Sequence, residues 1–169
     1  MTALTQVQNS NNDLAHRMAA SGVVPGPGQS MNEAMALLAA ARNAAYAEAA
    51  RGRLGHGVSV LMRALNTQPC SFDLKSDMAT LLLSAGELAH AASYARGALS
   101  VQPAHGPSLY ALGFALSGLG EAGEAATVLR RLLRGKARAS LLAEAPELLP
   151  VVRAELTRIK SLTRQGQGR

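Results

Sequence analysis

Aromatic residues are scarce in this chain of 169 residues, where they make up 3% of the total, with no Trp, three Tyr and two Phe. A core therefore cannot be built around large rings. The hydrophobic residues still make up 48% of the chain, and most of them are Ala and Leu. Both are strong helix formers, and small side chains let helices approach closely. We expect one all-α domain.

The chain has a single cysteine, Cys70, which excludes an intrachain disulfide. It also lacks the run of about 18 apolar residues that a membrane-spanning helix needs. No basic residue precedes Arg17 and no apolar segment follows it, so no signal peptide is expected. These absences predict a cytoplasmic protein without a transmembrane segment.

Patterns that carry chemistry are missing as well. No spacing of His, Cys, Asp or Glu matches a metal site, and Cys70 has no evident His partner for nucleophilic catalysis. The Gly-rich segments lack the lysine and the strand of a phosphate-binding loop. Asp73 and Asp77 lie one helical turn apart, a pairing more typical of a solvent-facing surface than of acid–base catalysis. We predict no enzymatic activity, no cofactor and no metal.

Acidic residues are rare at the C-terminal end. The net charge is +6, and residues 130–169 hold 10 basic and 3 acidic side chains against 7 and 8 in residues 1–129. Five of the basic residues form a predicted basic patch: Arg130, Arg131, Arg134, Lys136 and Arg138. This patch could face an acidic protein, a nucleic acid or lipid phosphates. Alternatively, it only complements a helix dipole. Nucleic acid is disfavoured because no aromatic residues or known binding motif accompany the charges.

An internal repeat of 34 residues dominates what is present. The segment 52–69 aligns with 86–103, and Gly, Leu, His, Ser, Ala, Gln and Pro recur in register. A further step of 34 leads from Gly86 to Gly120. A fixed period of this length is typical of stacked helix-turn-helix units.

Local signals divide the repeats into helices. Ser30 and Glu33 form a capping-box pattern that begins a long helix ending near residue 50. Glycines at 52, 86 and 118–120 mark turns, and Gly135 is expected to close the third repeat. The predicted parts are a flexible leader (1–29), three repeats (about 38–71, 72–105 and 106–139), a capping helix (140–163) and a disordered tail (164–169).

The repeats resemble the tetratricopeptide family. The third repeat reads Leu109-x2-Leu112-Gly113-x2-Leu116 and then Ala125-x3-Leu129, close to the family pattern W-x2-L-G-x2-Y…A-x3-F. No repeat carries the aromatic residue at the first position. The resemblance covers roughly residues 38–139 and implies a short right-handed α-solenoid with a C-terminal capping helix. An unrelated helical bundle with accidental periodicity is the alternative.

In size and layout the chain is also similar to the class II chaperones of bacterial type III secretion, and to the smaller chaperones of needle and export subunits. That resemblance implies a chaperone that holds a segment of a client protein and that can form homo-oligomers. Family members tend to be acidic, whereas this chain is basic. A self-assembling scaffold that docks on a membrane or an acidic surface, and a nucleic-acid adaptor, are the alternatives.

In tetratricopeptide proteins the first helix of each pair lines the concave side. Tyr110, Phe114 and Ser117 share one face of such a helix. Equivalent positions in the other repeats, with Asp73 at the edge, complete the predicted partner-binding groove: Arg42, Tyr46, Asp73, Ser76, Thr80, Leu83, Tyr110, Phe114 and Ser117. The alternative is that these aromatic residues pack inside the molecule under the leader or the terminal helix. Clamps for C-terminal carboxylates use several basic residues here, and only Arg42 is available, so such a clamp is not expected.

Overall fold

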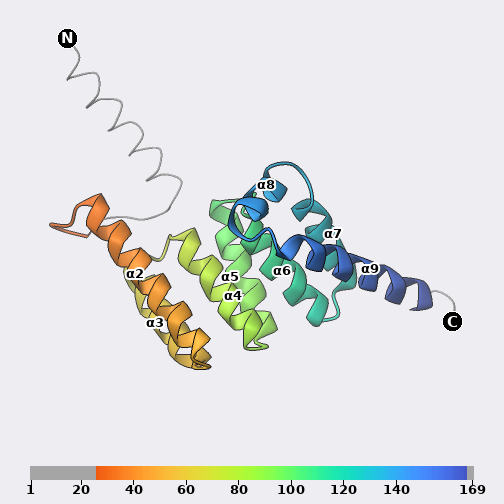
Figure 1. Ribbon diagram of the computed structural model, residues 1–169, viewed down its shortest axis with the longest axis horizontal. Helices are drawn as coiled ribbons and strands as arrows, with labels where there is room; N and C mark the ends of the chain where they lie inside the picture. The colour runs from red at the N-terminus through yellow and green to blue at the C-terminus, as the bar shows by residue number, and fades with distance from the viewer. Residues whose placement is uncertain (1–25, 167–169) are drawn as a thin grey trace, which may run out of the picture.

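The computed structural model describes residues 26–166, which contain eight α-helices and no β-strand (Figure 1). In chain order they are α2 (Met31–Ala50), α3 (Leu54–Thr67), α4 (Phe72–Ser84), α5 (Leu88–Val101), α6 (Gly106–Gly118), α7 (Ala122–Leu132), α8 (Gly135–Glu144) and α9 (Leu148–Gly166). The expectation of an all-α protein is confirmed for this range. Most of the predicted leader, residues 1–25, and residues 167–169 of the predicted tail lie outside the described residues.

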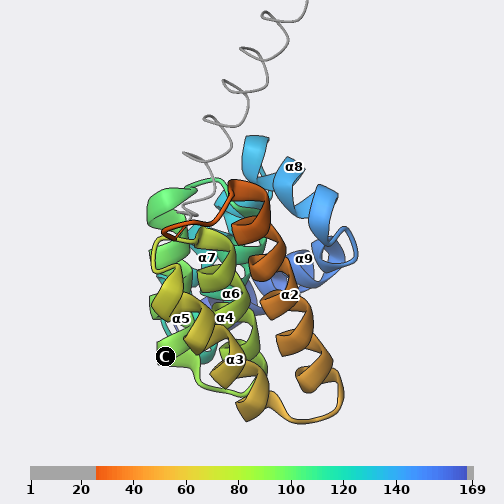
Figure 2. The same ribbon diagram turned by 90° about the vertical axis from the view of Figure 1, so that its left-hand side faces the viewer.

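Six of the helices form the three expected pairs, α2 with α3, α4 with α5 and α6 with α7 (Figures 1 and 2). The turn inside each pair has the same geometry. Gly52, Gly86 and Gly120 adopt φ of 78°, 80° and 84°, a region that L side chains rarely adopt. The residue after each glycine donates its N–H to a carbonyl five positions back, at 2.9 Å in all three turns. This is a Schellman motif, and its need for glycine explains why glycine recurs every 34 residues.

The first helices of the pairs lie closer to one another than the second helices do. In the described part of the chain, α2 contacts α4, α4 contacts α6 and α6 contacts α8, whereas α3 with α5 and α5 with α7 make at most marginal contacts. Closer packing on one side bends the stack toward that side. We call the surface presented by α2, α4 and α6 the inner face.

Small residues set the distance between paired helices. Ala45 and Ala79 are fully buried, and Gly113 is buried at the equivalent position of the third pair. A Cβ atom at Gly113 would collide with the side chain of Leu129 on α7. The leucines fill the rest of the core, among them Leu74, Leu109 and Leu116. The core therefore consists of aliphatic residues, as the shortage of aromatic residues predicted.

The C-terminal region differs from the prediction of one capping helix over 140–163. The chain forms two helices there, because Ala145 leaves the helical conformation (φ −153°, ψ 66°) ahead of Pro146. A residue before proline is disfavoured in a helix. Gly135 begins α8 rather than closing the third repeat, since the break falls at the extended Arg134. The second helix, α9, continues to Gly166, so residues 164–166 of the predicted tail are helical.

The two helices extend the stack in different ways. α8 packs on α6, continuing the row of first helices, and a Cβ atom at Gly106 would collide with the backbone of Leu141 on α8. α9 packs on α7 and buries Val152 and Ile159 at the end of the solenoid (Figure 1). A cap of this kind covers the apolar face that a last repeat leaves exposed. None of the helices in residues 26–166 combines the length and hydropathy required to span a bilayer.

Candidate functional site

The residues predicted to form the groove lie on the first helices of the three pairs. Arg42 and Tyr46 come from α2, four more residues from α4, and Tyr110, Phe114 and Ser117 from α6. All are at least partly exposed except Ser76, which is 3% exposed. The prediction that Ser76 edges the groove is therefore wrong, because its side chain is buried and presents almost no surface to a partner. Whether the other residues bind a partner stays a prediction.

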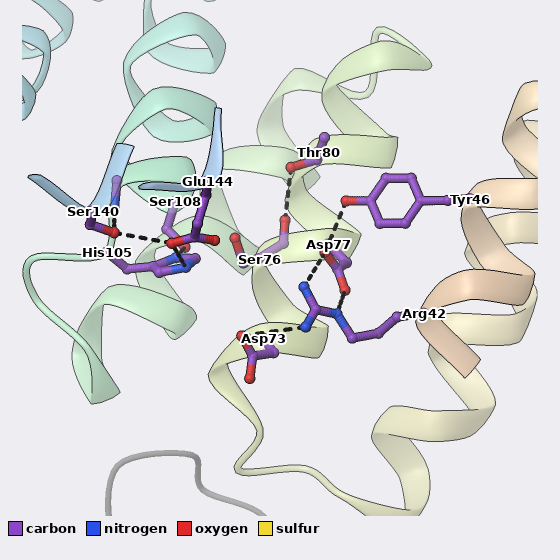
Figure 3. A network of polar contacts seen from close by, with 11 residues as sticks. Arg42, Tyr46, Asp73, Ser76, Asp77, Thr80, His105, Ser108, Ser140 and Glu144 are labelled. Atoms are coloured by element: carbon purple, nitrogen blue, oxygen red, sulfur yellow. Dashed lines mark hydrogen bonds and ion pairs between the residues drawn. The ribbon is translucent and has the colours of Figure 1, made fainter. Parts of the chain in front are cut away.

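A polar network ties α2 to α4 on the inner face (Figure 3). The Arg42 guanidinium forms an ion pair with Asp77, and its Nη1 atom lies 3.7 Å from Asp73 Oδ1. Tyr46 donates its hydroxyl hydrogen to Asp77 Oδ1 at 2.9 Å. The Asp77 side chain is only 6% exposed, so its charge depends on these partners. The expectation that Asp73 and Asp77 form a merely solvent-facing pair is therefore wrong.

The environment changes how these groups titrate. Burial raises the pKa of Tyr46 above its ordinary value, and the charge of Asp77 adds to this effect. The Tyr46 hydroxyl therefore keeps its proton and remains a donor. Burial also raises the pKa of Asp73, although Arg42 opposes the shift. Arg42 is thus held between two carboxylates, and its charge is matched inside the molecule.

A second polar cluster lies beside the first, at the N-terminal end of α6 (Figure 3). The His105 ring is buried, packs edge-on against Phe72 at 5.1 Å, and lies 2.8 Å from Ser108 Oγ. Its Nε2 atom is 3.4 Å from Glu144 Oε1 on α8. The hydrogen bond from His105 holds the pKa of Glu144 below its usual range. This cluster fixes α8 against α6.

The apolar part of the inner face is centred on α6. The rings of Tyr110 and Phe114 lie 4.4 Å apart, pack partly against the core and remain partly exposed. Leu83 and Thr80 of α4 are also partly exposed. Tyr110 and Phe114 thus pack within the molecule and also present surface to the outside. Neither a role in partner binding nor a role in internal packing accounts for them alone.

The far end of the inner face is polar again. Ser117 of α6 donates a hydrogen bond to Glu155 of α9, and Arg158 donates to both Ser117 Oγ (2.8 Å) and Glu155 Oε1 (2.6 Å). The hydrogen bond from Arg158 lowers the pKa of Glu155. The partly exposed aromatic surface is therefore bordered by ion pairs at both ends.

The predicted basic patch does not form one helical stripe. α7 ends at Leu132, and Arg134 is the extended residue before α8, so Arg130 and Arg138 belong to different helices. Four of the five residues instead surround a surface depression of about 520 Å³. Its lining consists of Ala104, Thr127, Arg130, Arg131, Arg134, Gly135, Lys136 and Ala137. Arg138 is exposed and does not line it.

Residues suited to metal binding do not cluster. Within residues 26–166 there is no group of three or more His, Cys, Asp or Glu side chains that could hold a metal ion. Cys70 is exposed in the turn between the first and second pairs.

Sequence reasoning missed Asp77, His105 and Glu144. The signal for Asp77 is the repeat itself: Arg42 and Asp77 are 35 residues apart, one more than the period, which places them on facing first helices. No comparable signal exists for His105 and Glu144. Their contact depends on the break between α7 and α8, which the sequence pattern did not reveal.

Comparison with solved structures supports the architecture. The chain superposes on the first tetratricopeptide domain of Spaghetti (RPAP3) bound to an HSP90 peptide, with a TM-score of 0.62, 16% identity and coverage of 74% of this chain and 91% of that one. The Sgt2 tetratricopeptide domain from Aspergillus fumigatus gives a TM-score of 0.63 at 18% identity, covering 76% and 80%.

The type III secretion translocator chaperone SycD of Yersinia enterocolitica gives a TM-score of 0.62 at 17% identity, covering 82% of this chain and 99% of that one. No protein-family model matches the sequence, and neither does any curated protein. At these identities the likeness concerns the fold: the chain has a tetratricopeptide-type fold.

Proposed function

We propose that this protein binds an extended, partly apolar segment of another protein on its inner face and acts as a chaperone or adaptor. One observation carries the proposal. Of the five aromatic residues in the chain, three lie on the first helices α2 and α6 and are at least partly exposed, namely Tyr46, Tyr110 and Phe114. Rigid aromatic side chains give a large contact area at a low entropic cost, and they often anchor interfaces.

The polar residues indicate which peptides fit. Arg42 is the one basic residue that α2, α4 and α6 place at the predicted positions, and it is paired with Asp73 and Asp77. An acidic peptide like the HSP90 peptide SRMEEVD bound to RPAP3 would have to break these pairs. A peptide with neutral apolar side chains would leave them intact. The preferred segment is therefore neutral and partly apolar.

The finer version of the proposal is a cytoplasmic chaperone of type III secretion. The likeness to SycD supports it, because nearly the whole of that chaperone, 99%, is covered. The client would be a secreted, apolar protein whose exposed segment is kept from aggregating. A homo-oligomeric scaffold without a client is the competing version, and it requires no peptide on the inner face.

The test starts from a library of random twelve-residue peptides displayed on phage. Enriched peptides are synthesised, and their affinity is measured for the protein and for Tyr110→Ala/Phe114→Ala. We expect binding to weaken by about 2 kcal/mol, roughly thirtyfold, because two anchors are lost. The matched control is Met62→Ala/Tyr94→Ala, which removes a contact of similar size between second helices, Tyr94 Oη to Met62 Sδ at 3.8 Å.

The proposal fails if both double variants weaken binding equally, or if the inner-face variant binds as the original does while its circular dichroism and melting temperature are retained. The chaperone version is tested by co-expression with the protein encoded next to it. A stoichiometric complex supports that version. Homo-oligomers that exclude the neighbour's product contradict it and favour the scaffold.

A further inference from the structure

A cluster of unpaired positive charges surrounds the depression between α7 and α8. Arg130, Arg134 and Lys136 are exposed, and they make no ion pair with any acidic residue in the described range. Arg131 donates a hydrogen bond to the carbonyl oxygen of Pro103 at 2.7 Å, which fixes one wall. No acidic residue lines the depression.

Five arginines elsewhere are paired, whereas Arg63 and Arg153 are isolated exposed charges rather than members of a cluster. Arg42, Arg51, Arg53, Arg96 and Arg158 each contact a carboxylate. The sequence places no Asp or Glu between residues 125 and 143. Glu124 lies on α7 one turn before the lining residue Thr127, and it is paired with Arg96. The remaining carboxylate there, Glu144, is engaged by His105 and Ser140.

Helix dipoles explain only part of this cluster. Arg130 and Arg131 lie in the last turn of α7, where a positive charge is favourable. Arg134 and Lys136 lie at the start of α8, where the dipole is positive and a further positive charge is unfavourable. Like charges also repel one another across the depression. The fold therefore accepts a local cost that a ligand of opposite charge would remove.

We infer that this depression is a docking site for an acidic peptide segment. Guanidinium groups match carboxylates as two-pronged donors, and the three arginines around one depression suit a segment with several Asp or Glu side chains. A volume of about 520 Å³ accommodates a few side chains. The lining contains no aromatic residue on which an unpaired base could stack, which disfavours single-stranded nucleic acid.

The site is separate from the inner face and does not depend on the function proposed for it. The inner face selects neutral apolar residues and is formed by first helices, whereas the depression lies on α7, the loop before α6 and the start of α8. A single partner could use both surfaces, or two partners could each use one.

The experiment uses fluorescence anisotropy to measure the affinity of the protein for a labelled peptide that contains four consecutive acidic residues, Asp and Glu. A neutral analogue, in which Asn replaces Asp and Gln replaces Glu, is measured in the same way. The test variant is Arg130→Glu/Arg134→Glu. The matched control is Arg63→Glu/Arg153→Glu, which changes the net charge equally at two exposed positions outside the depression. A single-stranded oligonucleotide is titrated in parallel.

We expect the acidic peptide to bind more tightly than its neutral analogue and to weaken as salt is raised from 0.05 to 0.5 M. The test variant should lose roughly tenfold or more in affinity, and the control should stay within about twofold. Equal losses in both variants would show a general effect of net charge and overturn the inference. Absence of peptide binding, or tighter binding of the oligonucleotide at the same residues, would also overturn it.

Two checks keep the result interpretable. Both variants are first shown to have the melting temperature of the original protein, and if the glutamate variant is unfolded, Arg130→Gln/Arg134→Gln replaces it with the same expected ranking. Sedimentation then tests whether the acidic segment comes from a second copy. If the original protein is a dimer and only the test variant is a monomer, the depression binds a second copy of the chain rather than a partner peptide. That result would contradict the inference.

Discussion

Positive charge has opposite roles in two regions of this molecule. On the inner face Arg42 is held by Asp73 and Asp77 and joins α2 to α4. Around the depression Arg130 and Arg134 are exposed and join no helices together. The comparison separates basic residues that stabilise the fold from basic residues that are available to a ligand. Counting charges along the sequence cannot make this distinction.

The largest effect is expected from breaking the inner-face network. Asp77→Ala removes the closer of the two carboxylates that pair with Arg42 and the acceptor for Tyr46, and leaves the partly buried guanidinium with only the 3.7 Å contact to Asp73. Removing one member of a buried pair costs about 3–5 kcal/mol, but Arg42 is 34% exposed, so we expect about 2 kcal/mol. Urea unfolding measures the loss.

The control for this variant is Glu147→Ala, which removes an exposed carboxylate. It should change the free energy of unfolding by less than about 0.5 kcal/mol. An equal loss in both variants would mean that the Arg42 network contributes no more than any surface charge.

A smaller effect, dependent on pH, is expected at α8. The pKa of Glu144 is lowered in the folded protein, chiefly by His105, so the ionised form stabilises the fold. That contribution is complete above the ordinary pKa of about 4.5 and is lost as the pH falls through the lowered value. Glu144→Gln should therefore reduce stability near pH 7, by less than about 1 kcal/mol because the side chain is 44% exposed.

Urea titrations of the original protein and Glu144→Gln at pH 7, 5 and 3 test this expectation. The two curves should converge at the acidic end. A difference that stays constant with pH would show that the Glu144 charge does not fix α8.

The smallest effect on stability is expected from the arginines around the depression. Arg130→Gln/Arg134→Gln should leave the free energy of unfolding unchanged, or raise it by up to about 0.5 kcal/mol, because like charges are removed and no ion pair is lost. Arg42→Gln should lower it. Thermal melts of both variants in the same buffer decide the matter, and a clear destabilisation by the first variant would assign its arginines a structural role.

The sequence predicted the repeated part of this fold well, because each helix pair is defined by the same few residues. Gly52, Gly86 and Gly120 are needed at turns of positive φ, and Gly113 is needed at a helix crossing. The C-terminal region was harder, since α8 and α9 do not follow the period. The prediction of one helix there missed the break ahead of Pro146.

The candidate site was predicted only in outline. The 34-residue period predicted that the aromatic residues share one face, and the structure shows Tyr110 and Phe114 in contact on α6. The period could not show that Ser76 is buried, because burial depends on how closely the neighbouring helices approach α4. Nor could it show that Asp77 is paired, since its neighbours belong to another repeat.

Peptide binding to the inner face is tested most directly by nuclear magnetic resonance. A phage-selected peptide is titrated into the isotope-labelled protein, and changes in the amide signals are mapped on the helices. We expect the largest changes on α4 and α6, around Thr80, Leu83, Tyr110 and Phe114. Changes confined to α3, α5 and α7 would place the peptide on the opposite side and contradict the account.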